Sequence, residues 1–238
     1  MSEYSFALTE DERKGFVENG FVVLRNAELG KLRASIELGL RQIALAVLQR
    51  EPEFASVVPS LEQRTIGEIV EHLVRNERGT SVSGRLYRVL CSAPDLVSVV
   101  GSPALLGVAR TLGLAVPVAG TMPILRLDRP QDTFHKTPPH QDFWFSLLSP
   151  NAITFWFPAG EIVAEMGFLE VISGSHREGI VRFRRQADSG NPYTLAQDRL
   201  ESEWRQVEVP KDGILTFSQM LIHRSGHNQS AHTRMSVQ

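Results

Sequence analysis

The first half of the chain carries apolar residues at helical spacing. The stretch "LTEDERKGFVENG" predicts a helix that begins after Thr9, because Glu12 follows three residues later in a capping-box pattern, and Gly20 is typical of a helix end. The next stretch, "FVVLRNA", predicts a short strand. Apolar positions three and four residues apart then predict further helices at residues 30–51, 60–77 and 102–114.

After about residue 115 the pattern changes to short runs of β-branched and aromatic residues separated by Gly, Pro, Asn and Asp. These runs predict strands at residues 117–127, 152–157, 167–174, 204–210, 213–223 and 233–238. Many short strands after a helical block predict a mainly β fold with flanking helices, either an antiparallel sandwich or a jelly roll. Neither a repeat nor a linker interrupts the pattern. We therefore expect a single domain over residues 1–238, with a helical block to about 114 and a β core from about 115.

The polar stretch at residues 177–203 is long for a connection inside a compact domain. Long loops of this kind often cover a site, so we expect it to border the mouth of a cavity and to be more mobile than the strands. A solvated surface excursion is the alternative interpretation.

The composition narrows the classes of function. A hydrophobic share of 42% and a charged share of 22% are ordinary for a globular protein, and a net charge of -2 gives no basic footprint for nucleic acid or an anionic membrane. No apolar run reaches the roughly 18 to 20 residues of a membrane span, and the first residues are too acidic and polar for a secretory signal. The single cysteine excludes an intrachain disulfide and favours a reducing, cytoplasmic setting.

A candidate metal site begins in "PPHQDFWF", residues 138–145. If this stretch is extended, His140 and Asp142 face the same way and Gln141 is turned away. A facing histidine and carboxylate are two of the three ligands of the 2-His-1-carboxylate triad, which binds non-haem Fe(II) and leaves coordination positions open. A surface strand with two polar residues is the alternative.

A third ligand has to come from another part of the chain. Among the seven histidines, His223 stands out because it ends an apolar run, which makes it either a core residue or a ligand. His227 lies four residues later, as in a helical zinc site, but Gly226 and the polar residues around it argue against a helix. Arg234 starts the last predicted strand, where a hairpin can bring it beside His223, and its guanidinium suits a carboxylate. Simple solvent exposure is the alternative for Arg234.

Four segments carry a resemblance to a known family, and they occur in the family's order. They are "LTEDERKGFVENGFVVLRN", "PHQDFWF", "ITFWFPAGEIVAEMGFLEVISGSHREG" and "DGILTFSQMLIHRSGHNQSAHTRMSVQ". Together they resemble the phytanoyl-CoA dioxygenase family, a branch of the Fe(II)- and 2-oxoglutarate-dependent oxygenases. The resemblance implies a double-stranded β-helix, the cupin-like jelly roll. It also implies that His140, Asp142 and His223 bind iron and that Arg234 anchors the distal carboxylate of 2-oxoglutarate.

Further residues match positions near the cosubstrate less specifically. Trp156 and Gln141 match family positions beside the ligands, although packing around the site explains them equally well. Arg126 is a candidate for holding the 1-carboxylate of 2-oxoglutarate, and Arg85 and Arg88 are weaker candidates. The segment "AEMG" departs from the family, which commonly has an acidic residue and Asn before the Gly.

The resemblance implies Fe(II), 2-oxoglutarate and O2 as cofactor and cosubstrates. Oxidative decarboxylation would yield succinate and CO2, and a small molecule would undergo hydroxylation, desaturation or oxidative cyclisation. Asp142 stands where related halogenases have a small residue, which disfavours halogenation. The breadth of the family favours natural-product tailoring, with no nucleic-acid or membrane partner. A jelly-roll metal-dependent hydrolase or isomerase, and a non-catalytic metal-binding module, are the alternatives.

Overall fold

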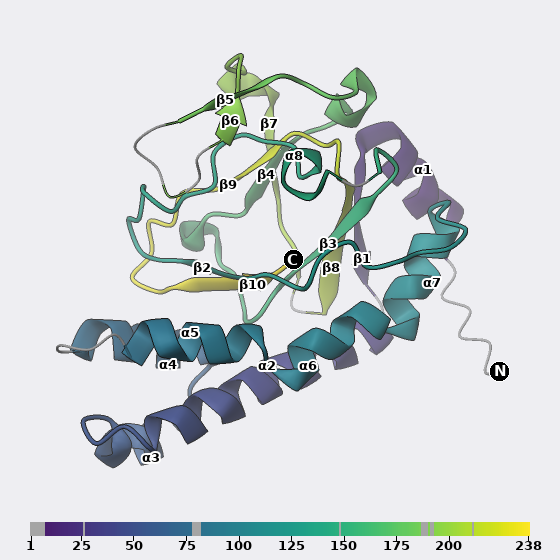
Figure 1. Ribbon diagram of the computed structural model, residues 1–238. Helices are drawn as coiled ribbons and strands as arrows, with labels where there is room; N and C mark the ends of the chain where they lie inside the picture. The colour runs from purple at the N-terminus through teal and green to yellow at the C-terminus, as the bar shows by residue number, and fades with distance from the viewer. Residues whose placement is uncertain are drawn as a thin grey trace.

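The computed structural model describes residues 8–25, 27–77, 82–147, 149–186, 190, 193–210 and 212–238. Two antiparallel sheets face each other, and a layer of helices covers the outer face of the larger sheet (Figure 1). Within the described ranges no single helix is long and apolar enough to cross a membrane. One bent pair, Val82–Gly101 with Pro103–Thr111, meets the length and composition criteria only when its two parts are joined.

The helices begin and end where local sequence signals place them. Thr9 and Glu12 form a capping box on α1 (Glu10–Asn19), and Gly20 ends it with a φ of 83°. A second capping box, between Thr65 and Glu68, starts α4. The helical layer comprises α2 (Ala27–Leu48), α3 (Val58–Leu61), α4 (Ile66–Asn76), α5 (Val82–Cys91), α6 (Pro94–Ser98) and α7 (Pro103–Thr111).

A buried arginine fixes the longest helix to the sheets. Arg33 of α2 donates to the backbone carbonyls of Pro158, Gly160 and Pro210. Burial lowers the pKa of Arg33, yet its carbonyl partners satisfy the charged head. The helix is therefore held by polar contacts as well as by its apolar face.

The larger sheet has the strand order β1-β8-β3-β10-β2 and the smaller one β7-β4-β9. Apolar side chains from both sheets form a core between them, and a second core lies between the larger sheet and the helices. The strands are β1 (Phe21–Arg25), β2 (Leu125–Asp128), β3 (Ile153–Pro158), β4 (Leu169–Ile172), β7 (Trp204–Val207), β8 (Gly213–Ser218), β9 (His223–Ser225) and β10 (Arg234–Val237).

The alternation of side chains on β10 positions the candidate site. Met235 and Val237 belong to the core against the helices, so Arg234 and Ser236 face the interior between the sheets. In register, Arg234 lies opposite Asp128 and Ser236 opposite Arg126 on β2. Two interior-facing residues from each strand are thus brought together.

Several predicted boundaries differ from the structure. The helix predicted at 60–77 starts only at Ile66, because its N-cap is Thr65. The strand predicted at 117–127 is confined to β2, since Pro117, Gly120 and Pro123 interrupt the ladder before it. Helix α5 was not predicted.

The polar stretch 177–203 contains a two-stranded sheet, β5 (Phe183–Arg185) with β6 (Tyr193–Leu195). Residues 187–189, 191 and 192 of this stretch lie outside the described residues. The hairpin is docked beside the candidate metal segment, because the Leu195 N–H donates to the Pro139 carbonyl and the Trp144 indole donates to the Val181 carbonyl. It therefore borders that segment, while its place at the mouth of a cavity and its mobility stay predictions.

Candidate metal centre

His140, Asp142 and His223 meet in the interior. Asp142 Oδ1 lies 3.3 Å from His140 Nε2 and 3.4 Å from His223 Nε2. All three side chains are buried, and one potential ligand atom of each lies within 4.8 Å of the others. Two imidazole nitrogens and one carboxylate oxygen form the donor set preferred by non-haem Fe(II).

The backbone that brings these ligands together is not the predicted strand. His140 makes only an isolated antiparallel bridge, in which its N–H and carbonyl pair with the carbonyl and N–H of His223, both at 3.0 Å. Asp142 has a helical backbone and precedes the short helix α8 (Phe143–Ser146). His223 begins β9 rather than ending a strand, because β8 stops at Ser218 and a turn follows. The three residues do meet, but an extended strand through His140 and Asp142 is not what brings them together.

Backbone carbonyls orient both imidazoles. His140 Nδ1 lies 2.8 Å from the Pro138 carbonyl oxygen, and His223 Nδ1 lies 3.1 Å from that of Leu221. A carbonyl only accepts, so each Nδ1 carries a proton, and in the neutral imidazole the lone pair is then on Nε2, the nitrogen that faces Asp142 Oδ1. This tautomer is the one that binds a metal through Nε2.

The electrostatics shift the pKa values of His140 and Asp142 downward. Burial lowers the pKa of His140, and the neighbouring His223 acts in the same direction. Burial alone would raise the pKa of Asp142, but its interactions with His223 and His140 outweigh burial and hold it well below its usual range. The carboxylate is therefore ionised, and protons compete weakly for His140.

The second oxygen of Asp142 has its own partners. Asp142 Oδ2 accepts hydrogen bonds of 2.7 Å from the Thr154 hydroxyl on β3 and of 2.7 Å from the Gln238 side-chain amide. Sequence reasoning missed both residues. A signal existed for Gln238, since it lies four positions after Arg234 and therefore on the same face of an extended chain.

Arg234 is buried between the sheets and makes its hydrogen bonds with other residues than His140, Asp142 and His223. Its Nη2 and Nε lie 2.8 and 3.2 Å from Asp128 Oδ2, and its Nη1 donates to the Gly167 carbonyl. Gly167 has a φ of 73°, and a Cβ there would collide with the His227 carbonyl, so glycine is required in "AEMG". Next to Arg234 on the same face, the buried Ser236 hydroxyl has no hydrogen-bond partner among the described residues.

The structure places the other three predicted site residues in different surroundings. Arg126 faces the interior and donates to the Thr137 hydroxyl, while Trp156 is buried in the core between the sheets. The Gln141 amide is used by the backbone: its nitrogen donates to Gly179 and Met220, and its oxygen accepts from Val181.

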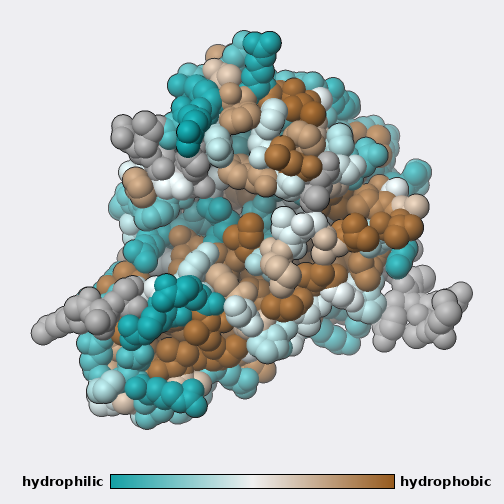
Figure 2. Space-filling model, viewed as in Figure 1, coloured by the Kyte–Doolittle hydropathy of each residue, from teal (hydrophilic) through white to brown (hydrophobic). Residues whose placement is uncertain are grey.

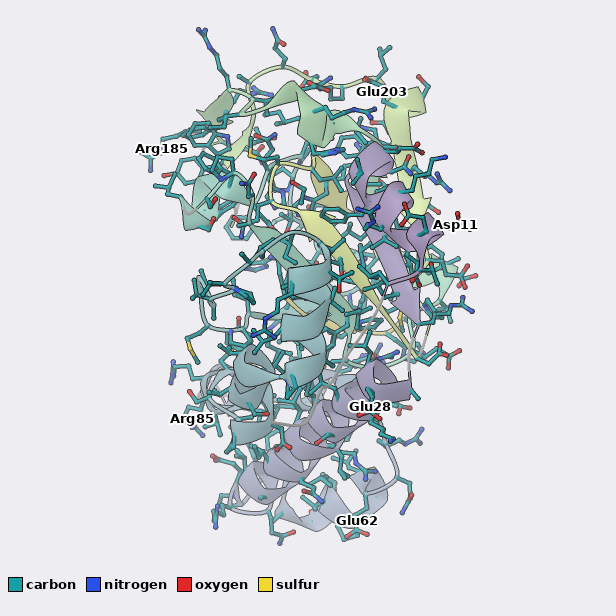
Figure 3. The ribbon with its side chains drawn as sticks, turned by 90° about the vertical axis from the view of Figure 1, so that its right-hand side faces the viewer. Asp11, Glu28, Glu62, Arg85, Arg185 and Glu203 are labelled. Carbon is teal, nitrogen blue, oxygen red and sulfur yellow. The ribbon has the colours of Figure 1, made fainter. Side chains whose placement is uncertain are left out.

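The two weaker candidates are not brought to the site. Arg85 lies in the helical layer (Figure 3), paired with Glu51 at 2.8 Å. Arg88 is exposed on the same helix, α5. Their proposed role as holders of the 1-carboxylate is therefore wrong. A helix that packs outside the larger sheet cannot direct them between the sheets.

Known proteins resemble the chain along nearly its whole length. Solved structures with the same fold include the non-haem monooxygenase ThoJ, with a TM-score of 0.58 and 18% identity over 95% of this chain and 75% of that one. EvdO2 from Micromonospora carbonacea var. aurantiaca gives 0.56 and 16%, over 99% and 91%. The epimerase SnoN gives 0.54 and 16%, over 96% and 80%.

These structures identify the two facing sheets with their helical cover as a jelly roll of the predicted class. A search of curated proteins finds no significant match. The family model described as phytanoyl-CoA dioxygenase (PhyH) matches residues 16–236, a span that contains His140, Asp142, His223 and Arg234. The chain therefore belongs to the phytanoyl-CoA dioxygenase family.

Proposed function

We propose that the protein is a non-haem Fe(II)- and 2-oxoglutarate-dependent oxygenase that oxidises a small molecule. The observation that carries the proposal is the buried meeting of His140, Asp142 and His223, with both Nε2 atoms facing Asp142 Oδ1. Membership of the family supports it. So does the SnoN structure, which holds Fe3+, alpha-ketoglutarate and nogalamycin RO.

The interior has the donors that a dicarboxylate requires. Arg234 and the unpartnered Ser236 hydroxyl lie side by side on one strand face, and they are suited to the distal carboxylate. Asp128 already neutralises Arg234, so the net positive charge for a dianionic cosubstrate would come from the metal and from a further cation. Arg126 supplies that charge from the facing position on β2, which favours it for the 1-carboxylate.

Trp156 and Gln141 fit supporting roles in this proposal. Trp156 contributes an apolar wall beneath the cosubstrate, as its place in the inter-sheet core supports. The Gln141 side chain acts indirectly, because its hydrogen bonds tie the residues after His140 to the backbone at Val181 and Met220.

When bound, iron with 2-oxoglutarate supplies the oxidant for O2-dependent chemistry, coupled to decarboxylation to succinate and CO2. The protein's own residues would orient the cosubstrate and enclose the metal site. The two imidazoles and Asp142 Oδ1 would hold the ion, and Arg234 would fix one end of the cosubstrate. Burial of all these groups excludes water and strengthens each ion pair.

We further propose that the substrate carries an uncharged ring system. The Phe145 ring packs edge-on against His140 with 5.3 Å between centroids, although the side chain is 49% exposed. Tyr193 and Phe183 of the β5–β6 hairpin and Trp144 extend the row of rings outward. Exposed aromatic rings beside a reactive centre favour stacking on a ring. Figure 2 shows further hydrophobic side chains over this face.

A cavity of about 270 Å³ borders Asp142 and Phe145. Asp142, the proposed metal ligand, is the only charged residue in its described lining, so the carboxylate of an amino acid would find no cationic side chain there. This argues for a natural-product scaffold over an amino acid.

A cytoplasmic location stays a prediction.

The decisive experiment is anaerobic addition of Fe(II) and 2-oxoglutarate to the metal-free protein, followed by absorption spectroscopy. A metal-to-ligand charge-transfer band in the visible, absent from His223→Ala, is the expected result. A hydrolase or isomerase using the same ligands would bind metal but show no such band and form no succinate. Absence of the band at saturating Fe(II) and 2-oxoglutarate would reject the oxygenase.

A further inference from the structure

The two oxygens of the Asp142 carboxylate lie in different surroundings. Oδ1 faces the His140 and His223 nitrogens, whereas Oδ2 faces away from them and accepts from Thr154 and Gln238. A carboxylate only accepts, so the Thr154 hydroxyl and the Gln238 amide nitrogen must both be donors. Oδ2 is therefore occupied by two charge-assisted hydrogen bonds of 2.7 Å.

Both donors are held by the larger sheet. Thr154 is buried on β3, where it lies in register with Phe217 of β8. Gln238 follows β10, and its backbone pairs in both directions with Ile124, at 3.0 and 2.8 Å. The ladders hold both backbones in place, so either donor could follow a rotating carboxylate only by leaving its side-chain rotamer.

We propose that Thr154 and Gln238 are positioning residues that restrict Asp142 to binding the metal through Oδ1 alone. The inference rests on the proposed function. An octahedral ion with three protein ligands keeps three positions, two of which the chelating cosubstrate needs. If Asp142 rotated so that both of its oxygens bound the ion, the second oxygen would occupy one of these three positions. Rotation toward that mode breaks both hydrogen bonds at Oδ2, so the pair keeps the position open.

The test uses isosteric variants that remove one donor each, Thr154→Val and Gln238→Met, together with their double variant. Metal-free proteins are titrated under argon with Co(II), whose visible absorption reports coordination number, and the Co(II) proteins are then titrated with 2-oxoglutarate. We expect affinity for 2-oxoglutarate to fall by about 10- to 100-fold, the usual effect of removing partners of a ligand. Affinity for Co(II) should fall by less, because the released Oδ2 can itself bind the ion.

Two matched variants separate positioning from general stability. Thr154→Ser keeps the hydroxyl and should restore the 2-oxoglutarate affinity of the parent. Thr216→Val removes a buried hydroxyl from β8 that has no partner among the described residues. This control should change neither titration, because it makes the same chemical change away from Asp142.

The outcomes separate this inference from the proposed function. If the double variant binds 2-oxoglutarate within about twofold of the parent, the positioning role is refuted. Equal loss of Co(II) affinity, 2-oxoglutarate affinity and melting temperature would also refute it, by showing a purely structural role. If the parent binds Co(II) but not 2-oxoglutarate, the proposed function fails. In that case the Co(II) spectra of parent and double variant still decide whether Asp142 changes its binding mode.

Discussion

Arg234 and Asp128 form a buried ion pair across strands β10 and β2, with 2.8 Å between Nη2 and Oδ2. Both the Nε and Nη2 edges of the guanidinium face this one carboxylate oxygen, and Nη1 faces the Gly167 carbonyl. The arginine proposed to bind 2-oxoglutarate is thus already oriented and already neutralised. Asp128 was not predicted, and it changes what substitutions at Arg234 should do.

Arg234→Ala should weaken 2-oxoglutarate binding about 30-fold or more while leaving Fe(II) affinity nearly intact. Leaving one partner of a buried charged hydrogen bond unpaired costs roughly 2 to 5 kcal/mol, and about 1.4 kcal/mol is tenfold. Anaerobic titrations of the variant with each ligand measure both affinities. The double variant Arg234→Ala with Asp128→Asn controls for the carboxylate left unpaired. Binding of 2-oxoglutarate like the parent's would assign the distal carboxylate to another residue.

Asp128→Asn should have the opposite effect on the cosubstrate. Removing the competing negative charge leaves the Arg234 charge free for 2-oxoglutarate, so affinity for the dianion should rise. The free protein should become less stable, because a buried cation loses its partner. Thermal unfolding with and without 2-oxoglutarate measures both effects, and the variant should gain the larger increase in melting temperature. A smaller gain than the parent's would show that Asp128 serves to present the guanidinium rather than to compete.

His223→Ala should lose the metal before it loses the fold. The variant removes one of three donors but keeps the backbone pairing with His140, which uses only main-chain atoms. Fe(II) or Co(II) binding should fall below detection at concentrations that saturate the parent, with the circular dichroism spectrum retained. Metal binding at parental affinity would remove His223 from the ligand set.

Glu68→Ala should reduce stability in a pH-dependent way. The Thr65 backbone N–H donates to Glu68 and lowers its pKa below the ordinary 4.5. A carboxylate with a lowered folded pKa contributes its stability above that value and loses it as the pH falls. The variant should therefore be less stable than the parent by about 0.5 to 1 kcal/mol at pH 7, and by less at pH 3. Denaturant unfolding at both pH values tests this, with the exposed Glu62→Ala as control.

Helix ends and strands that depend on residues close in the sequence could be predicted from the sequence alone. The capping boxes at Thr9 and Thr65 and the glycine at position 20 depend on neighbours three or four residues away, so the sequence displays them directly. The strand runs around Trp156 and Leu215 were likewise visible as β-branched and aromatic stretches. Fold class followed from their order.

The details of the site depend on contacts between distant segments. The family motif grouped the candidate metal ligands, but the helical backbone at Asp142 and the turn before His223 contradict the extended pattern assumed for them. The partnership of Arg234 with Asp128 and of Asp142 with Thr154 arises only from sheet register. No spacing along the chain encodes that register, because it is set by how apolar faces pack.

Strand β10 assigns alternate residues to two different tasks. Arg234 and Ser236 face the site, whereas Met235 and Val237 fill the core against the helices. A slip of one residue would exchange the two sets. It would place the Arg234 guanidinium among the apolar side chains of the core, and Met235 and Val237 would face the candidate site. The two sets cannot change faces independently, so any shift in the register of β10 against β2 would disturb the candidate site and the core against the helices together.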